Sequence, residues 1–151
     1  MSGRTRKSRR IAPLHDLARN EELSASRKLA DAARELAAEE CQLAQLAGFR
    51  DEYDRLESAT AEGLDPLRLQ NRRAFMARLA EAIREQERRI ESARAALAGS
   101  TETWRGRRID AAALGAAIER FAEEERRADG RREQRDSDEA ARQSAGRVRE
   151  T

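Results

Sequence analysis

The sequence predicts an all-α fold: a long antiparallel two-helix coiled-coil hairpin whose second helix overhangs the first. Charged residues make up 40% of the chain and aromatic residues only 3%, which is typical of long helices and leaves too few large apolar side chains for a globular core. Apolar residues recur every seven positions from Met76 to Ile118, which indicates a coiled coil. One break, residues 60–66, divides the chain, and so short a connection favours antiparallel packing.

The first predicted helix spans residues 11–59 and follows residues 1–10, which hold five basic residues and which we expect to form a flexible arm. Pro13 suits the first turn of a helix, where its missing N–H costs nothing. Three leucines then recur at intervals of seven: Leu29, Leu36 and Leu43. Two further pairs repeat the interval in another phase, so we expect the apolar stripe to shift near residue 46: Leu46 with Tyr53, and Phe49 with Leu56.

The turn at residues 60–66 contains two signals of a helix boundary. Gly63 can adopt a positive φ, which other residues rarely do. Asp65 followed by Pro66 is typical of a helix start, because Asp caps the free backbone N–H groups and Pro fits the first helical position.

The second predicted helix spans residues 67–143. One set of seam positions is apolar throughout: Met76, Ile83, Ile90, Leu97, Trp104, Ala111 and Ile118. The partner set is apolar at only four of its seven positions: Leu79, Gln86, Ala93, Ser100, Arg107, Leu114 and Phe121. Because Gly99 and Gly106 each cost about 1 kcal/mol in a helix interior, we expect residues 99–107 to be locally weak.

Large apolar residues end at Phe121, so residues 122–143 are expected to form a solvated helix beyond the partner helix. Opposite charges recur there at intervals of four, as in Glu123 with Arg127, and such pairs support an exposed helix. Residues 144–151 are predicted to be a frayed tail.

The sequence contains no recognisable chemistry. His15 and Cys41 are the only histidine and cysteine, so we predict no enzyme activity, no catalytic residues, no metal and no cofactor. A single cysteine fits a reducing cytosol, and no segment is apolar enough to span a membrane. The net charge is only +2 with both signs interleaved, which argues against nucleic-acid binding.

Three of the few aromatic residues gather near the turn: Phe49 and Tyr53 before it, and Phe75 after it. In a hairpin they would meet at the same end. Two interpretations remain open: the rings staple the tip of the hairpin, or some of them form an exposed apolar patch that binds a protein.

Three segments together resemble the flagellar FliJ family: Glu40–Tyr53, Leu69–Ile83 and Arg131–Glu139. The middle segment contains the Asn71 and Phe75 pair of that family ahead of a Leu-x-x-Ala-Ile run, and the resemblance extends from about Ile11 to Ala141. It implies a small non-enzymatic component of the flagellar type III protein export apparatus, required for motility, which connects the export ATPase FliI to the cytoplasmic domain of the export gate FlhA and handles export chaperones. It also implies a cytoplasmic location, peripheral to the inner face of the cell membrane at the flagellar base.

Carried over by motif, the resemblance implies two sets of protein-binding residues. The export gate would bind Gln42, Leu46, Phe49 and Tyr53 of the first helix and Phe75, Leu79, Ala82 and Gln86 of the second. The export ATPase would bind Arg126, Arg127, Gln134 and Asp138. We expect a monomer; the alternatives are a related injectisome stalk of the YscO type and a generic structural coiled coil that homo-oligomerises through its heptads.

Overall fold

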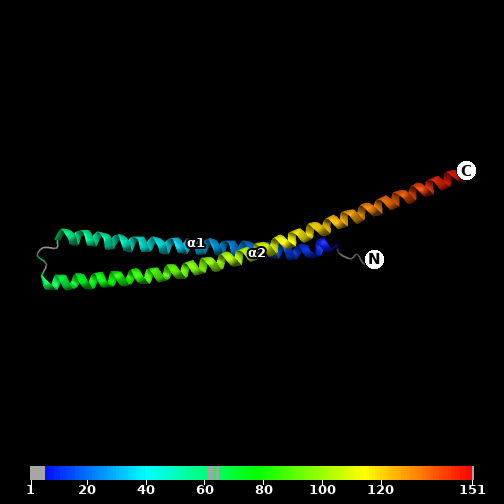
Figure 1. The fold of residues 1–151 in the computed structure, drawn as a ribbon. Coiled ribbons are helices and arrows are strands. Elements are labelled where there is room, and N and C mark those ends of the chain that lie inside the picture. Colours follow the sequence, from blue (N-terminus) through cyan, green and yellow to red (C-terminus); the bar gives the residue numbers. More distant parts are fainter. Residues whose placement is uncertain (1–5, 61–62, 64, 151) are drawn as a thin grey trace. The chain divides into compact units, whose positions relative to one another are not determined.

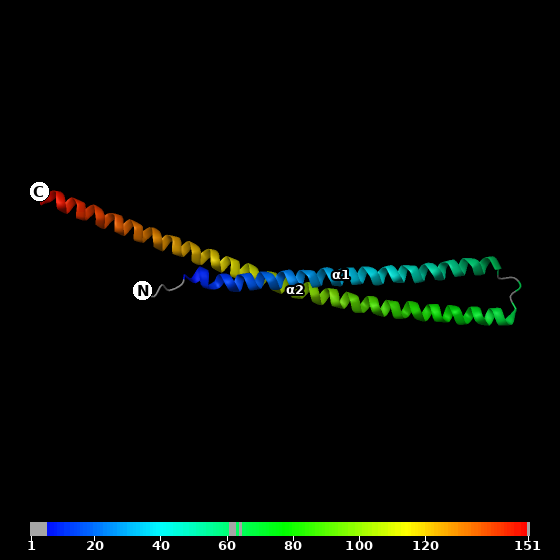
Figure 2. The ribbon, with the colours of Figure 1, turned by 180° about the vertical axis from the view of Figure 1, so that it is seen from behind.

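The computed structural model describes residues 6–60, residue 63 and residues 65–150. It contains two helices, α1 (Lys7–Thr60) and α2 (Pro66–Arg149), which run antiparallel and pack against each other (Figures 1 and 2). The predicted fold class, an all-α two-helix hairpin, is confirmed. The chain divides into two units, one built from residues 24–105 and containing the turn, the other built from residues 1–23 and 106–151. We call them the turn unit and the terminal unit.

Helix α2 begins as its first residues predict. The carboxylate of Asp65 accepts a hydrogen bond from the backbone N–H of Arg68 at 2.8 Å, which makes Asp65 the N-cap and Pro66 the first helical residue. Before it, Gly63 has a φ of 101°, a conformation that L side chains rarely adopt. Gly63 and the pair Asp65 and Pro66 therefore adopt the conformations that the sequence predicts for the turn and for the start of α2.

In the turn unit, buried and half-buried positions follow one seven-residue pattern on each helix. On α2 the most buried side chains are Leu79, Ile83, Gln86, Ile90 and Ala93. On α1 the pattern includes Leu29, Leu36 and Leu43 together with Ala25, Ala32, Glu39, Leu46 and Tyr53. The expected shift of the stripe near residue 46 is therefore wrong, because Leu46 and Tyr53 occupy the second seam position of the heptad that the three leucines begin.

The remaining repeat of α1, Phe49 with Leu56, lies beside the seam. These two side chains are 57% and 64% exposed, so they continue no buried stripe. Their interval of seven instead places them on the same flank of α1.

In the terminal unit, the start of α1 packs on α2 farther along the chain than predicted. Residues 7–10, expected in the flexible arm, are helical, because Ser8 donates hydrogen bonds to the Glu125 carboxylate from its backbone N (3.2 Å) and its hydroxyl (2.6 Å). Arg6 adds an ion pair with Asp129 at 3.0 Å, and the Lys7 ammonium lies 5.5 Å from the centre of the Phe121 ring.

The overhang of α2 is therefore shorter than expected. Residues 122, 125, 128 and 129 are still half-buried, and full exposure begins at residue 130 and continues through residue 150. Helix α2 ends at Arg149, so residues 144–149, expected to fray, are helical. Residues 130–149 continue past the start of α1 in Figure 1.

His15 lies in the seam of the terminal unit and is half-buried. Its Nε2 lies 3.2 Å from the position that a Cβ would occupy at Gly115 of α2. The glycine therefore lets the imidazole approach the backbone of α2 closely.

Candidate protein-binding surfaces

The turn unit carries the aromatic side chains of the predicted gate-binding set on one flank of the helix pair. We call this surface the aromatic face and define it by the eight predicted residues together with Leu56: Gln42, Leu46, Phe49, Tyr53, Leu56, Phe75, Leu79, Ala82 and Gln86. On each helix these positions alternate between the seam and the flank beside it. Because corresponding flanks of two antiparallel helices meet, Phe49 and Phe75 share a face although they are 26 positions apart.

Two shallow grooves run along the aromatic face. The first is lined by five of the predicted residues, Gln42, Leu46, Phe49, Ala82 and Gln86, together with Gln45, Glu85 and Arg89. The second is lined by Tyr53, Leu56, Glu57, Arg68, Asn71, Arg72 and Phe75. Leu79, the remaining predicted residue, is buried in the seam. The structure thus brings all eight predicted residues together on or directly beneath one surface.

The aromatic rings have two different environments. Tyr53 is half-buried and packs against Phe75, with 4.8 Å between ring centroids and 39° between ring planes. Phe75 nevertheless remains 43% exposed, and Phe49 is 57% exposed. Tyr53 and Phe75 accordingly staple the two helices, whereas Phe49 presents most of its ring to solvent.

Leu56 is a surface residue to which the family resemblance assigns no role. Its side chain is 64% exposed and lines the second groove beside Tyr53 and Phe75. The sequence does indicate this position, because Leu56 follows Phe49 by seven residues. That interval places both side chains on one flank of α1, and the seam identifies which flank it is.

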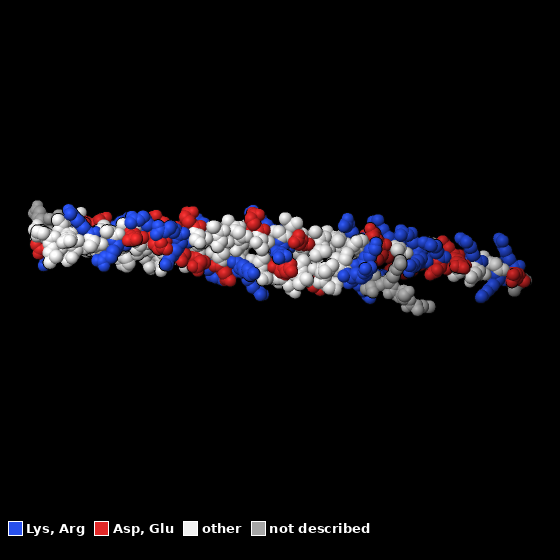
Figure 3. Space-filling model, turned by 90° about the horizontal axis from the view of Figure 1, so that it is seen from below, with Lys and Arg blue, Asp and Glu red and all other residues white. Residues whose placement is uncertain are grey.

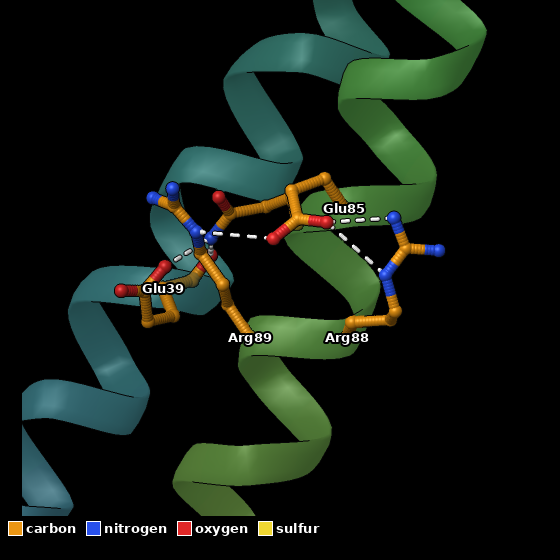
Figure 4. A network of polar contacts seen from close by, with 5 residues as sticks. Glu39, Glu85, Arg88 and Arg89 are labelled. Atoms are coloured by element: carbon orange, nitrogen blue, oxygen red, sulfur yellow. Dashed lines mark hydrogen bonds and ion pairs between the residues drawn. The ribbon is translucent and has the colours of Figure 1, made fainter.

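A polar network (Figure 4) includes Glu85 and Arg89, which line the first groove. The Gln86 amide is buried and donates to the backbone carbonyl of Glu39 at 2.9 Å and to the Glu39 carboxylate. Beside it, Glu85 accepts a hydrogen bond from Arg88 at 2.6 Å, and this bond, with the charges of Arg88 and Arg89, lowers the pKa of Glu85. The network thus provides charge and hydrogen-bonding groups beside the apolar side chains of the groove, Leu46, Phe49 and Ala82.

The predicted ATPase-binding residues all lie on the exposed surface of α2 in the terminal unit. Arg126 and Arg127 both pair with Glu123, at 2.6 and 3.3 Å, and the hydrogen bond from Arg126 is the main reason that the pKa of Glu123 is lowered. The Gln134 amide donates to Asp138 at 3.1 Å. These four residues are not gathered into one pocket. They are spread along a helix surface on which blue and red atoms are interspersed (Figure 3).

The described residues form no cluster of potential metal ligands. Among them, no three His, Cys, Asp or Glu side chains lie close enough together to hold a metal ion. Cys41 is exposed. Within the described part of the chain, no helix is both long enough and apolar enough to cross a membrane.

Comparison with known proteins identifies a family. Neither the curated proteins nor the solved structures contain a match to this chain. The family model described as flagellar FliJ protein matches residues 7–150, nearly the whole chain, and this range includes both surfaces described above. The resemblance seen in the sequence is thereby confirmed, and the chain belongs to the flagellar FliJ protein family, whose members are associated with flagellar protein export.

Proposed function

We propose that this protein is a non-enzymatic connector of the flagellar export apparatus that binds the export gate FlhA through the aromatic face and the export ATPase FliI through the terminal unit. It would work in the cytoplasm beside the inner face of the cell membrane, at the flagellar base, and would also handle export chaperones. Family membership supports the association with flagellar export, and the proposal adds the partners and the residues that bind them.

The observation that carries the gate-binding proposal is the exposure of large apolar side chains on one face. The chain has only five aromatic residues (three Phe, one Trp and one Tyr), and three of them lie on the aromatic face. Phe49, Leu56 and Phe75 are each more than 40% exposed. Grouped apolar side chains with a polar rim are the usual signature of a protein-binding site, since exposing them to water is unfavourable.

The terminal unit offers a different kind of surface. Residues 130–149 form a helix with no exposed large apolar side chain other than Val148, and its surface carries both charges. Such a helix suits a partner that offers complementary charges, which provide specificity and fast association more than affinity. This contrast in chemistry supports two different partners.

Binding of purified FlhA cytoplasmic domain to single-residue variants tests the gate surface. Phe49→Ala is the critical change, because the Phe49 side chain is 57% exposed and its removal should leave helix content unchanged. We expect it to weaken gate binding about tenfold or more, as for a central aromatic anchor. Leu67→Ala is the matched control, since Leu67 is 65% exposed near the turn but lines neither groove of the aromatic face.

Two results would contradict this assignment. Equal gate affinity of the Phe49→Ala and native chains would show that the aromatic face is not the gate-binding surface. A large loss of helix content in the Phe49→Ala chain would support the alternative that Phe49, like Tyr53 and Phe75, serves to staple the helices. Capture of FliI by the native chain, and its loss when Arg126 and Arg127 are both replaced by Ala, tests the other partner.

A further inference from the structure

The seam of the turn unit contains two polar pairs that join α1 to α2. Glu57 of α1 forms an ion pair with Arg72 of α2, and their side chains are only 27% and 15% exposed. Farther from the turn, Glu39 of α1 accepts hydrogen bonds from Gln86 of α2, which is 5% exposed. In both pairs α1 supplies a carboxylate and α2 supplies the donor.

These positions would normally hold apolar side chains. Two-helix coiled coils gain most of their stability from apolar residues at the seam, and a polar residue there costs stability while restricting which helices can pair. Polar groups at seam positions are therefore expected to act on the choice of partner and orientation.

We propose that Glu39, Glu57, Arg72 and Gln86 make α2 of the same chain the partner of α1, and prevent two copies of the chain from associating as a parallel coiled coil. In a parallel pair each seam residue faces its own counterpart. Glu57 would then face Glu57, Glu39 would face Glu39, and Arg72 would face Arg72, so like charges would be buried together. Only the antiparallel pairing of α1 with α2 matches each carboxylate with a donor.

The same residues disfavour a slipped hairpin. Moving α1 by one heptad would bring Arg50 opposite Arg72 in place of Glu57, and would leave Glu39 beside either Leu79 or Ala93 instead of Gln86. A carboxylate or guanidinium without a partner at the seam is unfavourable, and like charges there are worse. The short turn limits how far α1 can slip along α2, and the seam pairs make each slipped register less favourable.

This inference concerns the choice of partner helix and does not depend on which proteins the two surfaces bind. The critical variant replaces all four residues by leucine: Glu39→Leu, Glu57→Leu, Arg72→Leu and Gln86→Leu. The matched control places leucines at an exposed ion pair of α1, Asp31→Leu with Arg34→Leu, whose side chains are 69% and 74% exposed. The control therefore adds apolar surface without changing the seam.

Sedimentation equilibrium measures association, and a nitroxide spin label attached to Cys41 reports its orientation through the distance between labels. Cys41 is exposed and is the only cysteine, so the native chain can be labelled without mutation. Cys41 lies on the outer side of α1, so in two parallel copies of α1 the labels lie at the same level and no more than about 40 Å apart, roughly two helix diameters plus the label arms. In an antiparallel exchange of helices between chains the labels lie far apart, because Cys41 is about 20 residues from the turn and each residue adds about 1.5 Å.

We expect the native chain and the control to stay monomeric with no measurable distance between labels, and the four-leucine variant to associate about tenfold more strongly, with labels less than about 40 Å apart. The proposal is overturned if the native chain shows that short distance, or if the four-leucine variant remains monomeric or associates without it. Association of the control as strong as that of the four-leucine variant would also overturn it, since added leucine would then be a sufficient cause.

A charge exchange tests the pairing without adding apolar surface. Glu57→Arg or Arg72→Glu alone should lower amide-exchange protection of residues 50–59 about tenfold, and the two changes together should restore it. The proposal fails if the double variant is no better protected than either single variant, because the opposite charges would then have no role in joining the helices.

Discussion

Replacing two glycines in α2 should stabilise the protein. Gly99 and Gly106 lie in a continuous helix, and a Cβ added at either would meet no atom within 4 Å. Neither glycine is therefore required for packing. The nearby hydroxyls of Thr101 and Thr103 bond back to the carbonyls of Leu97 (2.8 Å) and Gly99 (3.0 Å), a geometry that slightly destabilises a helix. This is the segment that the sequence predicts to be locally weak.

The expected gain in the free energy of unfolding follows from helix propensity alone. Alanine is more favourable than glycine in a helix interior by about 1 kcal/mol. The two sites are seven residues apart and share no contact, so their effects should add to about 2 kcal/mol. For a chain of this length about 1 kcal/mol raises the melting temperature by roughly 2–4 °C, which predicts a rise of about 4–8 °C for the double variant.

Thermal unfolding followed by circular dichroism at 222 nm, with amide exchange of residues 97–107, measures the effect. Gly48→Ala is the matched control for propensity, since its Cβ also meets open space, and it should gain about 1 kcal/mol. Gly63→Ala should instead lower the free energy of unfolding, because the φ of 101° at this position is unfavourable for alanine by about 1–2 kcal/mol. A double variant at Gly99 and Gly106 that melts at or below the native temperature would refute the reasoning.

Three further outcomes are expected. Ile90→Ala should lower the free energy of unfolding by about 2–5 kcal/mol because Ile90 is only 4% exposed. Ile109→Ala, at 68% exposure, should change it by less than about 0.5 kcal/mol, and urea titrations compare the two. The hydrogen bonds from Ser8 lower the pKa of Glu125, so the stability they add is complete above the ordinary value of 4.5 and is lost as the pH falls through the lowered pKa. Protection of the amides in the first turn of α1, measured relative to the intrinsic exchange rate at each pH, should therefore fall in acid for the native chain, whereas Ser8→Ala should show low protection at neutral pH as well. Deleting residues 130–149, all exposed, should leave the melting temperature within about 2 °C of the native value but abolish FliI capture, and a large drop in melting temperature would contradict the exposure seen here.

The helices were predictable because their signals are local. The repeat from Met76 to Ile118 is visible in the sequence and identifies the buried side of α2, as the burial of Ile83 and Ile90 shows. Asp65 and Pro66 mark the start of α2 through contacts with residues only a few positions away.

The prediction failed on α1 where the seam is polar. Glu39 occupies a seam position between Ala32 and Leu46, and its charge interrupts the apolar pattern that would have connected Leu43 with Leu46 in one phase. A carboxylate is tolerated there because Gln86 of the other helix satisfies it. The sequence of α1 alone cannot reveal that partner.

The start of α1 shows the same dependence on distant residues. Arg6, Lys7 and Ser8 look like part of a basic arm, yet each contacts a residue of α2 more than 110 positions away. Those contacts extend α1 by four residues beyond its predicted start and shorten the exposed part of α2.

The sequence by itself determined that the chain is helical, where it turns, and which residue types each helix carries, because helix propensity, capping and heptad spacing act over a few neighbouring positions. Only the tertiary structure decided which flanks meet. Antiparallel packing places Phe49 and Leu56 on the same face as Phe75 and so creates the aromatic face, and it pairs Glu39 with Gln86 and Glu57 with Arg72. Those relations depend on the register between the two helices, which no local pattern of residues encodes.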